Sequence, residues 1–374
     1  MREHKEIGIG REARTTYHLD DVAVVPSRRT RSSKDVDTRW KIDAYEFETP
    51  FLSHATDALA TPEFIIEMDK QGGLGVINAE GLWGRETDLN AAIEQIREAL
   101  EDEDDEWAAT RVLQQMHQKE LDLDLLGERI AAVRSAGAIV AVRVSPQHAR
   151  ELAPVLQDAG LHLLVVQGTV VSAEHVTKEG EPLNLKEFIG SLDTPVIAGS
   201  VSDYHTALHL MRTGAAGVIV GAGDTTNWAT SGINTPMATA IADAAAARRD
   251  YLDETGGRYV HIIADGEIEL TGDAVKAIAC GADAVTLGAP LAKSKEAAGE
   301  GLYWQASAAH PKFPRSMVEQ VANRDELVSL NYVLHGPSSS PLGEFNFNGA
   351  LRRSMGKCGY TDLKSFQKVQ LDLV

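Results

Sequence analysis

Cysteine is scarce in this chain of 374 residues, because Cys280 and Cys358 are its only two copies. Two cysteines are too few for a disulfide framework, which favours a reducing compartment. Long apolar runs are also missing, since no window approaches the roughly 18 uninterrupted apolar residues that a transmembrane helix needs. The N-terminal residues lack the apolar run of a secretory signal. We therefore expect a soluble, cytoplasmic protein.

Positive charge is in short supply as well. Lysine and arginine number 36 against 55 aspartates and glutamates, which gives a formal net charge of −19 at pH 7. The negative electrostatic field of a protein with this net charge disfavours binding to nucleic acid or to an anionic membrane, so we predict neither partner. A small anionic ligand is still compatible with it, because a local dipole or a few arginines can outweigh the global field.

Short β-branched runs alternate with segments of helical periodicity along most of the chain. Eight strands are predicted, at Pro50–Ser53, Leu74–Ile77, Ile139–Val144, His162–Val166, Pro195–Ala198, Gly217–Val220, His261–Ala264 and Ala284–Leu287. Helices are predicted at Gln147–Gln157, Leu183–Leu192, Tyr204–Arg212, Met237–Arg249 and Gly272–Ala279. Apolar strands that alternate with helices indicate a parallel sheet. Eight such units fit a closed (β/α)8 TIM barrel better than an open, doubly wound α/β sheet.

The spacing of the strands is uneven in one place, where residues 79–138 separate the second strand from the third. Periodic patterns at Ala91–Leu100 and Leu121–Val133 predict helices, joined by the acidic run Glu101–Glu106. We expect a helical connection that lies on the barrel. After Ala292 the pattern becomes irregular and predicts loops plus a closing helix at Thr361–Val369. Residues 1–374 are thus predicted to form a single domain, with an N-terminal extension and an irregular C-terminal tail.

The active site of such a barrel lies at the carboxyl ends of the strands, where Asn78 and Arg143 are among the polar residues. The loops after the seventh and eighth strands often form a phosphate site from backbone N–H groups. Gly266 and Gly288 lie in these two loops, and glycine lets the backbone approach an anion closely. The alternative, that both glycines serve only tight strand-to-helix turns, stays open.

Several motifs resemble those of the IMP dehydrogenase/GMP reductase family. Leu19–Pro26 resembles the N-terminal signature of the family, and further motifs follow in the family's order at Gly72–Ile77, Val196–Gly199, Ile263–Gly266 and Gly349–Gly359. The resemblance covers nearly the whole chain and is strongest to the shorter paralogues. These lack the pair of CBS modules that the family usually inserts between the second and third barrel strands. Residues 79–138 are too few to hold that pair.

The resemblance implies a function and a set of site residues. The family reaction is the NAD-linked oxidation of IMP to XMP in guanine nucleotide biosynthesis, through a covalent thioimidate on a cysteine. The implied ligands are NAD and a purine mononucleotide (IMP, XMP or GMP), and the implied assembly is a homo-oligomer, a tetramer. No metal site is predicted, and the family's monovalent-cation site is in doubt here. The residues implied in substrate binding are Ser53, His54, Ser200, Gly221, Gly223, Asp265 (on the ribose), Gly266, Glu267, Gly288 and Ala289. The residues implied in cofactor binding are Gln167 and Thr169.

The loop that carries the family's nucleophilic cysteine departs from the pattern. Alignment forward from Gly221 places the cysteine position at Thr226, and alignment back from Gly232 places it at Thr225. A threonine hydroxyl is far less acidic than a thiol and needs an adjacent base to attack carbon. Glu267 is a second departure, since it replaces a phosphate-loop glycine and would repel a phosphate unless its side chain points away.

Three interpretations follow. The chain is an IMP dehydrogenase-related oxidoreductase whose turnover is impaired or silent because the cysteine is absent. Alternatively, it is a non-catalytic purine-nucleotide-binding or regulatory paralogue that associates with an active IMP dehydrogenase. The third interpretation is an FMN-dependent barrel oxidoreductase, which would share the elements at Gly72–Gly75 and Ala264–Gly266 but not those at Asp20–Pro26 or Gly349–Gly359. FMN would make the purified protein yellow.

Overall fold

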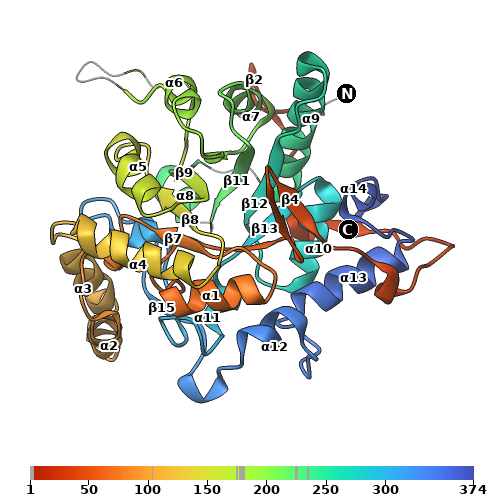
Figure 1. Ribbon diagram of the computed structural model, residues 1–374. Helices are drawn as coiled ribbons and strands as arrows, with labels where there is room; N and C mark the ends of the chain where they lie inside the picture. Colours follow the sequence, from red (N-terminus) through yellow and green to blue (C-terminus); the bar gives the residue numbers. More distant parts are fainter. Residues whose placement is uncertain (1–3, 103, 174–175, 177–181, 224–225, 234–235) are drawn as a thin grey trace.

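Eight parallel strands form a barrel in the computed structural model of the chain, which describes residues 4–374 except 103, 174–175, 177–181, 224–225 and 234–235 (Figure 1). A parallel bridge between Leu52 and Leu74 closes the sheet, and the Ser53 N–H donates to the Leu74 carbonyl at 2.9 Å. The predicted (β/α)8 TIM barrel is therefore confirmed. In the order in which they neighbour one another, the strands are β6 (Phe51–Ser53), β13 (Ala284–Leu287), β12 (His261–Gly266), β11 (Gly217–Gly223), β10 (Val196–Val201), β9 (Leu163–Gln167), β8 (Ala141–Val144) and β7 (Val76–Asn78).

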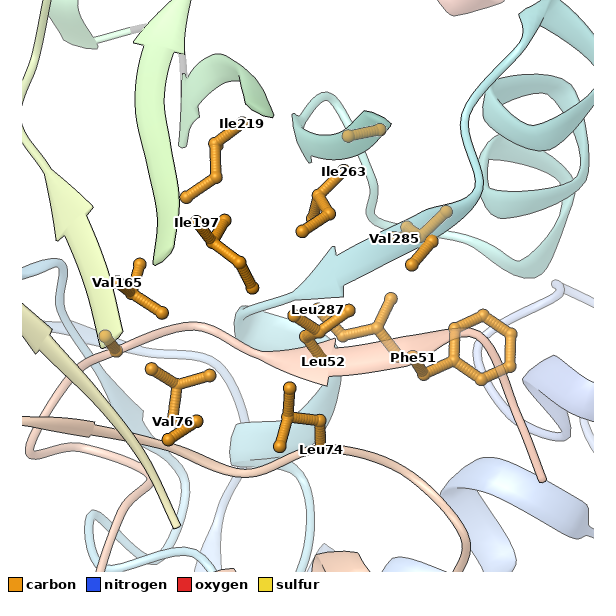
Figure 2. Packing of buried hydrophobic residues seen from close by; sticks show 14 of the residues in the cluster. Phe51, Leu52, Leu74, Val76, Val165, Ile197, Ile219, Ile263, Val285 and Leu287 are labelled. Carbon is orange, nitrogen blue, oxygen red and sulfur yellow. The ribbon is translucent and has the colours of Figure 1, made fainter. Parts of the chain in front are cut away.

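The barrel interior is an apolar core built from branched side chains. Every residue of β6, β7, β10 and β13 is buried, which explains why these strands read as continuous apolar runs in the sequence. Figure 2 shows the side chains that meet inside the barrel, among them Leu52, Val76, Val165, Ile197, Ile219 and Ile263. A packed interior leaves the loops at the carboxyl ends of the strands as the place for a site.

The helices that alternate with the strands begin and end where local signals place them. Thr61 caps the first, since its hydroxyl accepts from the Phe64 N–H at 3.1 Å and Pro62 occupies the first turn. The helix predicted to end at Arg249 continues further and stops where Gly256 adopts a left-handed conformation with φ 68°. These helices are α1 (Pro62–Lys70), α5 (Ala149–Asp158), α6 (Leu185–Gly190), α7 (Tyr204–Met211), α8 (Thr226–Ser231), α9 (Met237–Thr255), α10 (Thr271–Cys280) and α11 (Ala289–Ala292).

The connection between β7 and β8 contains the short 3-10 helix η3 (Leu82–Gly84) and then three helices, α2 (Leu89–Leu100), α3 (Ala108–Met116) and α4 (Leu123–Ser135). Asp88 and Asp122 cap α2 and α4 by accepting from backbone N–H groups of the first turn. Helix α3 was not predicted, although its buried residues Ala109, Leu113 and Met116 recur at helical spacing. Helix α3 packs on α2 and carries residues toward the barrel mouth.

The two ends of the chain pack beside the barrel. An N-terminal hairpin of β1 (His4–Gly8) and β2 (Arg11–Arg14) precedes the 3-10 helix η1 (Leu19–Asp21), and a second hairpin pairs β4 (Trp40–Ile42) with β5 (Tyr45–Phe47). Strand β3 (Val22–Val24) pairs with β16 (Leu371–Leu373), which brings residues from both ends together. No helix among the described residues combines the length and hydropathy needed to cross a membrane.

The C-terminal region contains more regular structure than its prolines suggest. Its elements are β14 (Leu302–Tyr303), η4 (Ala306–Ala309), β15 (Glu319–Gln320), η5 (Arg324–Glu326), α12 (Leu330–His335), α13 (Phe347–Lys357) and α14 (Leu363–Phe366). The short 3-10 helix η2 (Ser33–Asp35), from the N-terminal part of the chain, packs on α13. Helix α14 is shorter than the closing helix predicted at Thr361–Val369. Helix α13 escaped prediction because Gly349 and Gly356 lower its propensity. A Cβ at Gly356 would lie 2.8 Å from the Arg31 carbonyl oxygen, so close packing requires that glycine.

Candidate functional site

A cavity of about 650 Å³ opens at the carboxyl ends of the strands β7 to β10. Its walls come from the residues that follow these strands, from the end of α3 and from the segment 305–315 after β14. Ser200 and Thr169, which the family resemblance implied as ligand-binding residues, both line it. The charged and imidazole side chains on its walls are Glu80, Arg85, Arg143, Arg315, His54, His117, His148 and His310.

Arg143 lies on β8 and holds the polar side of this cavity together. Its guanidinium donates to the Gln167 carbonyl at 2.9 Å and to Asn78 Oδ1 at 3.3 Å, and it lies 3.5 Å from the Glu80 carboxylate. Glu80 also accepts from the Ser145 hydroxyl at 2.9 Å. Burial acts to raise the pKa of Glu80, but the charge of Arg143 and hydrogen bonds from neighbouring side chains lower it below its ordinary value. Glu80 is therefore ionised at neutral pH.

A second acid lies deeper, behind the cavity wall. Asp57 follows β6 and accepts from the Leu82 N–H at 2.9 Å, while His117 Nε2 lies 3.7 Å from its Oδ2. Burial raises the pKa of Asp57 to about 7 and lowers the pKa of His117 to about 4. The His117 Nδ1–H donates to the Leu113 carbonyl at 2.9 Å, which favours the charged form, but burial outweighs this contact and the imidazole is neutral at physiological pH. The pair places a carboxyl group that can hold a proton near pH 7 next to the cavity.

Asp265 lies at the end of β12, where it accepts a hydrogen bond of 2.7 Å from the Gln167 side chain. The structure thus brings together the residue expected on the ribose and one expected beside the cofactor. A small inner cavity adjoins both residues and His54. Ser53 also borders that inner cavity, but its hydroxyl accepts from the Val76 N–H at 2.9 Å and so serves the barrel.

The glycines near the expected phosphate site lie where the backbone packs closely. A Cβ at Gly221 would lie 2.4 Å from the Asp265 carbonyl oxygen, and a Cβ at Gly288 would lie 2.2 Å from the Tyr303 hydroxyl. Gly266 has φ 149° and pairs with Gly223 in the sheet. Close approach, and not turn geometry alone, therefore explains glycine at 221 and 288.

Tyr303, on β14, lies over Gly288 next to the start of α11. Its hydroxyl is 2.9 Å from His54 Nδ1, and both side chains are buried. The imidazole and the phenol therefore form one polar contact at the expected phosphate end of the site. Ala289, the first residue of α11, offers only its backbone there.

The expectation that Glu267 takes part in substrate binding at the phosphate site is not met by its side chain. Its carboxylate turns toward the N-terminal segment, where it lies 2.7 Å from His18 Nδ1 and accepts from the Leu19 N–H at 3.1 Å and the Met237 N–H at 3.4 Å. Its backbone is in the left-handed region, with φ 57°. Glu267 therefore anchors the N-terminal segment and does not face a phosphate.

The side chains at the two cysteine-equivalent positions, Thr225 and Thr226, are not part of the described site. Thr225 lies outside the described residues, and for Thr226 the structure describes only the backbone, as the first residue of α8. Cys280 ends α10, at the face of the barrel opposite the cavity, and burial raises the pKa of its thiol to about 12. Cys358 follows α13 and is also buried, which raises its pKa. Neither cysteine of the chain is placed to act as a nucleophile at the strand ends.

Several residues of the site carried no clear signal in the sequence. Arg315 and His117 come from an irregular segment and from the unpredicted end of α3, so no strand pattern pointed to them. Glu80 lies two residues beyond β7, and its position after a predicted strand could have revealed it. Among the residues that the structure describes, no group of three or more potential ligands is placed to hold a metal ion.

The chain is similar to known proteins over nearly its whole length. The sequence model of the IMP dehydrogenase / GMP reductase domain matches residues 15–373. The chain is 62% identical over 370 residues to an uncharacterized oxidoreductase of Mycolicibacterium smegmatis and 60% identical over 370 residues to one of Mycobacterium tuberculosis, with 98% of both chains covered in each case. It is 34% identical over 231 residues to the inosine-5'-monophosphate dehydrogenase of Aquifex aeolicus, which covers 57% of this chain and 44% of that enzyme.

A solved structure agrees with these relatives. The crystal structure of an IMP dehydrogenase/GMP reductase-like protein from Corynebacterium glutamicum matches with a TM-score of 0.95 and 65% sequence identity, over 99% of this chain and 98% of that one. The match of the family model over nearly the whole chain agrees with the order of the sequence motifs and with the barrel. The chain belongs to the IMP dehydrogenase/GMP reductase family, and it is related to oxidoreductases.

Proposed function

We propose that this protein binds a purine mononucleotide at the mouth of its barrel but does not carry out the family's thiol-dependent turnover. The observation that carries the proposal is the position of Asp265, which is buried at the end of β12 beside the small inner cavity and bonded to Gln167, in a chain whose two cysteines lie elsewhere. A buried carboxylate suits the two hydroxyls of a ribose, because charge-assisted hydrogen bonds are the strong ones.

The phosphate end of the nucleotide fits the loops after β12 and β13. Gly266 and Gly288 let the backbone approach an anion, and the Glu267 carboxylate is turned away. The Tyr303 hydroxyl, close to Gly288, is a further donor for a phosphate oxygen. The base then points toward His54 and the cavity. These contacts favour IMP, XMP or GMP as the ligand class, within the family's guanine nucleotide metabolism.

NAD is the second ligand that the family relationship suggests. The cavity of about 650 Å³, which reaches Asp265 through the Gln167 side chain on its wall, lies within the usual range of small-molecule sites. Gln167 and Thr169 line it with polar groups that suit a ribose or an amide, so the residues present fit a dinucleotide. When bound, NAD would supply a hydride acceptor. The chain's own part is to orient the two ligands through Gln167 and Asp265, which already share a hydrogen bond.

The missing thiol decides the expected activity. A free cysteine ionises near a pKa of about 8.5, whereas the hydroxyl of Thr225 or Thr226 needs a strong adjacent base to become a nucleophile. His54, an imidazole at the described barrel mouth, is already bound to Tyr303 through Nδ1. We therefore infer that NADH production from IMP is at most a trace. A tetramer, a cytoplasmic location and association with an active IMP dehydrogenase stay predictions.

Isothermal titration calorimetry with IMP, XMP and GMP tests the binding proposal. Replacement of Asp265 by asparagine removes the charge but keeps the shape. Hydrogen bonds to charged groups contribute about 1.5–3 kcal/mol each, so we expect about tenfold to hundredfold weaker binding. Asp69→Asn is the matched control, because Asp69 accepts from the Ile139 N–H near the opposite end of the barrel. Equal affinity of the wild type and the Asp265→Asn variant would refute the placement of the ribose.

A further inference from the structure

The wall of the large cavity carries an excess of positive charge, although the chain as a whole has a formal net charge of −19. Among its lining residues, Arg85, Arg143 and Arg315 are cationic, and Glu80 is the one carboxylate. Local charge, and not the global field, decides which ligand a cleft with low-dielectric walls attracts. The cavity therefore favours a ligand that carries negative charge.

The single carboxylate does not neutralise the three guanidinium groups. Glu80 is shared between Arg143, the Ser145 hydroxyl and the His148 imidazole, so its oxygens already have several partners. Arg85 donates to the Glu80 and Lys119 carbonyl oxygens and makes no ion pair within 4.0 Å among the described residues. On the cavity wall one carboxylate thus faces three guanidinium groups, and Asp57, behind the wall, is a further acid that acts on Arg85 and Arg143.

Arg315 is the guanidinium with the most unused hydrogen-bonding capacity. Within the described part of the chain, its one hydrogen bond is a long contact of 3.5 Å from Nη1 to the Phe313 carbonyl, and no carboxylate lies within ion-pair distance. Its Nε is buried and has no partner among the described residues. The guanidinium also lies 5.7 Å from the centre of the Phe313 ring, which holds it at the cavity wall. A guanidinium has five N–H donors, so most of those on Arg315 remain for a ligand.

Arg143 and Arg315 act on one another as like charges. Burial lowers the pKa of Arg143, and the charge of Arg315 lowers it further. Two guanidinium groups that face one cavity repel each other unless an anion lies between them. Ser200, whose hydroxyl is buried without a partner in the described chain, borders the same cavity and provides a neutral donor.

We propose that Arg143 and Arg315 bind the oxyanion of a second small ligand in this cavity. The site is separate from the loops at Gly266 and Gly288 where the mononucleotide phosphate is expected. The recognised group is a carboxylate or a phosphate, since the planar fork of arginine matches both. Its source is either the pyrophosphate of a dinucleotide cofactor or a free small acid.

Titration calorimetry with inorganic pyrophosphate and with succinate, in the absence of nucleotide, tests this proposal. We expect the wild type to bind at least one probe and Arg315→Met to bind it about tenfold more weakly or worse, because a charge-assisted contact is lost. Arg315 is the informative position because it lies in a loop segment, so the barrel stays intact. Arg39→Met removes the same charge from an exposed side chain far from the cavity and should leave binding unchanged.

Glu80→Gln provides a variant with the opposite expected effect. It removes the competing carboxylate but keeps hydrogen-bonding atoms toward Ser145, so anion binding should tighten severalfold. Tighter binding of pyrophosphate than of succinate, with NAD weakened to the same degree in Arg315→Met, identifies the dinucleotide as the source. Tighter binding of succinate identifies a free acid.

The proposal is overturned if neither probe binds the wild type, or if the wild type and Arg315→Met bind both probes equally. IMP titrated into Arg315→Met separates this failure from that of the proposed function. We expect its IMP affinity to equal that of the wild type, since the expected ribose and phosphate contacts lie at Asp265, Gly266 and Gly288.

Discussion

Replacement of Asp57 by asparagine should stabilise the protein at alkaline pH. Burial holds the pKa of this carboxyl at about 7, against an ordinary value of 3.8. Between these two values the folded chain binds a proton that the unfolded chain releases, so the stability falls as the pH rises. Each pH unit in this window is worth about 1.4 kcal/mol. From pH 5 to pH 8 the wild type should therefore lose about 3 kcal/mol from this group alone.

Asparagine keeps an oxygen acceptor for the Leu82 N–H, which donates to Asp57 at 2.9 Å, but has no charge to bury. The assay is urea unfolding of the wild type and Asp57→Asn, followed by tryptophan fluorescence at both pH values. The stability difference in favour of the variant should be larger by about 3 kcal/mol at pH 8 than at pH 5. The lowered pKa of His117 removes stability as the pH falls below its ordinary value of 6.5, but it does so in both proteins.

Asp203→Asn is a suitable control for this experiment. Burial acts to raise the pKa of Asp203, but hydrogen bonds from Thr206 and His205 lower it below its ordinary value. Asp203 is therefore ionised at both pH values, and its substitution should change the stability by the same amount at each. The reasoning about Asp57 is refuted if its variant shows the same stability difference from the wild type at pH 5 and pH 8.

Three other substitutions test separate parts of the structure. Glu267→Ala should cost about 1–3 kcal/mol and speed proteolysis of the N-terminal segment that its carboxylate holds, and unchanged proteolysis would contradict that anchoring role. Arg248→Met breaks a buried pair with Asp283 at 2.6 Å and should lower the unfolding free energy by about 3 kcal/mol in denaturant titrations, unless the pair is dispensable. Gly288→Ala should displace Tyr303 and weaken IMP binding in calorimetry, whereas wild-type affinity would show that the tyrosine adapts freely.

The barrel could be predicted because its strands are buried on both faces. Runs such as Val196–Gly199 and Ala284–Leu287 are continuous and apolar, and each is bounded by glycine, aspartate or proline, so eight strands were found with small errors at their ends. Helix α13 was missed because glycine interrupts its apolar pattern, so tertiary packing decides that helix and not local propensity. Helix α3 was missed although its residues favour a helix and its buried residues Ala109, Leu113 and Met116 recur at helical spacing.

The site could be predicted only where its residues end strands. Asp265, Gln167 and Ser200 follow the strand pattern, and the structure places all three at the barrel mouth. Arg315 could not be found this way, since it comes from an irregular segment whose position depends on packing. The direction of the Glu267 side chain could not be predicted from the sequence either, because it depends on contacts with the N-terminal segment, which lies more than 240 residues earlier in the chain.

An absorbance assay for NADH, with saturating IMP and NAD and a monovalent cation, tests the central claim most directly. We predict no turnover above a trace for the wild type. We expect the same for Thr226→Cys, because a thiol alone does not restore the rest of the altered loop. Calorimetry on the same samples should still detect the bound mononucleotide. Turnover on the order of 1 s⁻¹ by the wild type, within the ordinary range of enzymes, would contradict the account and show that another group replaces the thiol.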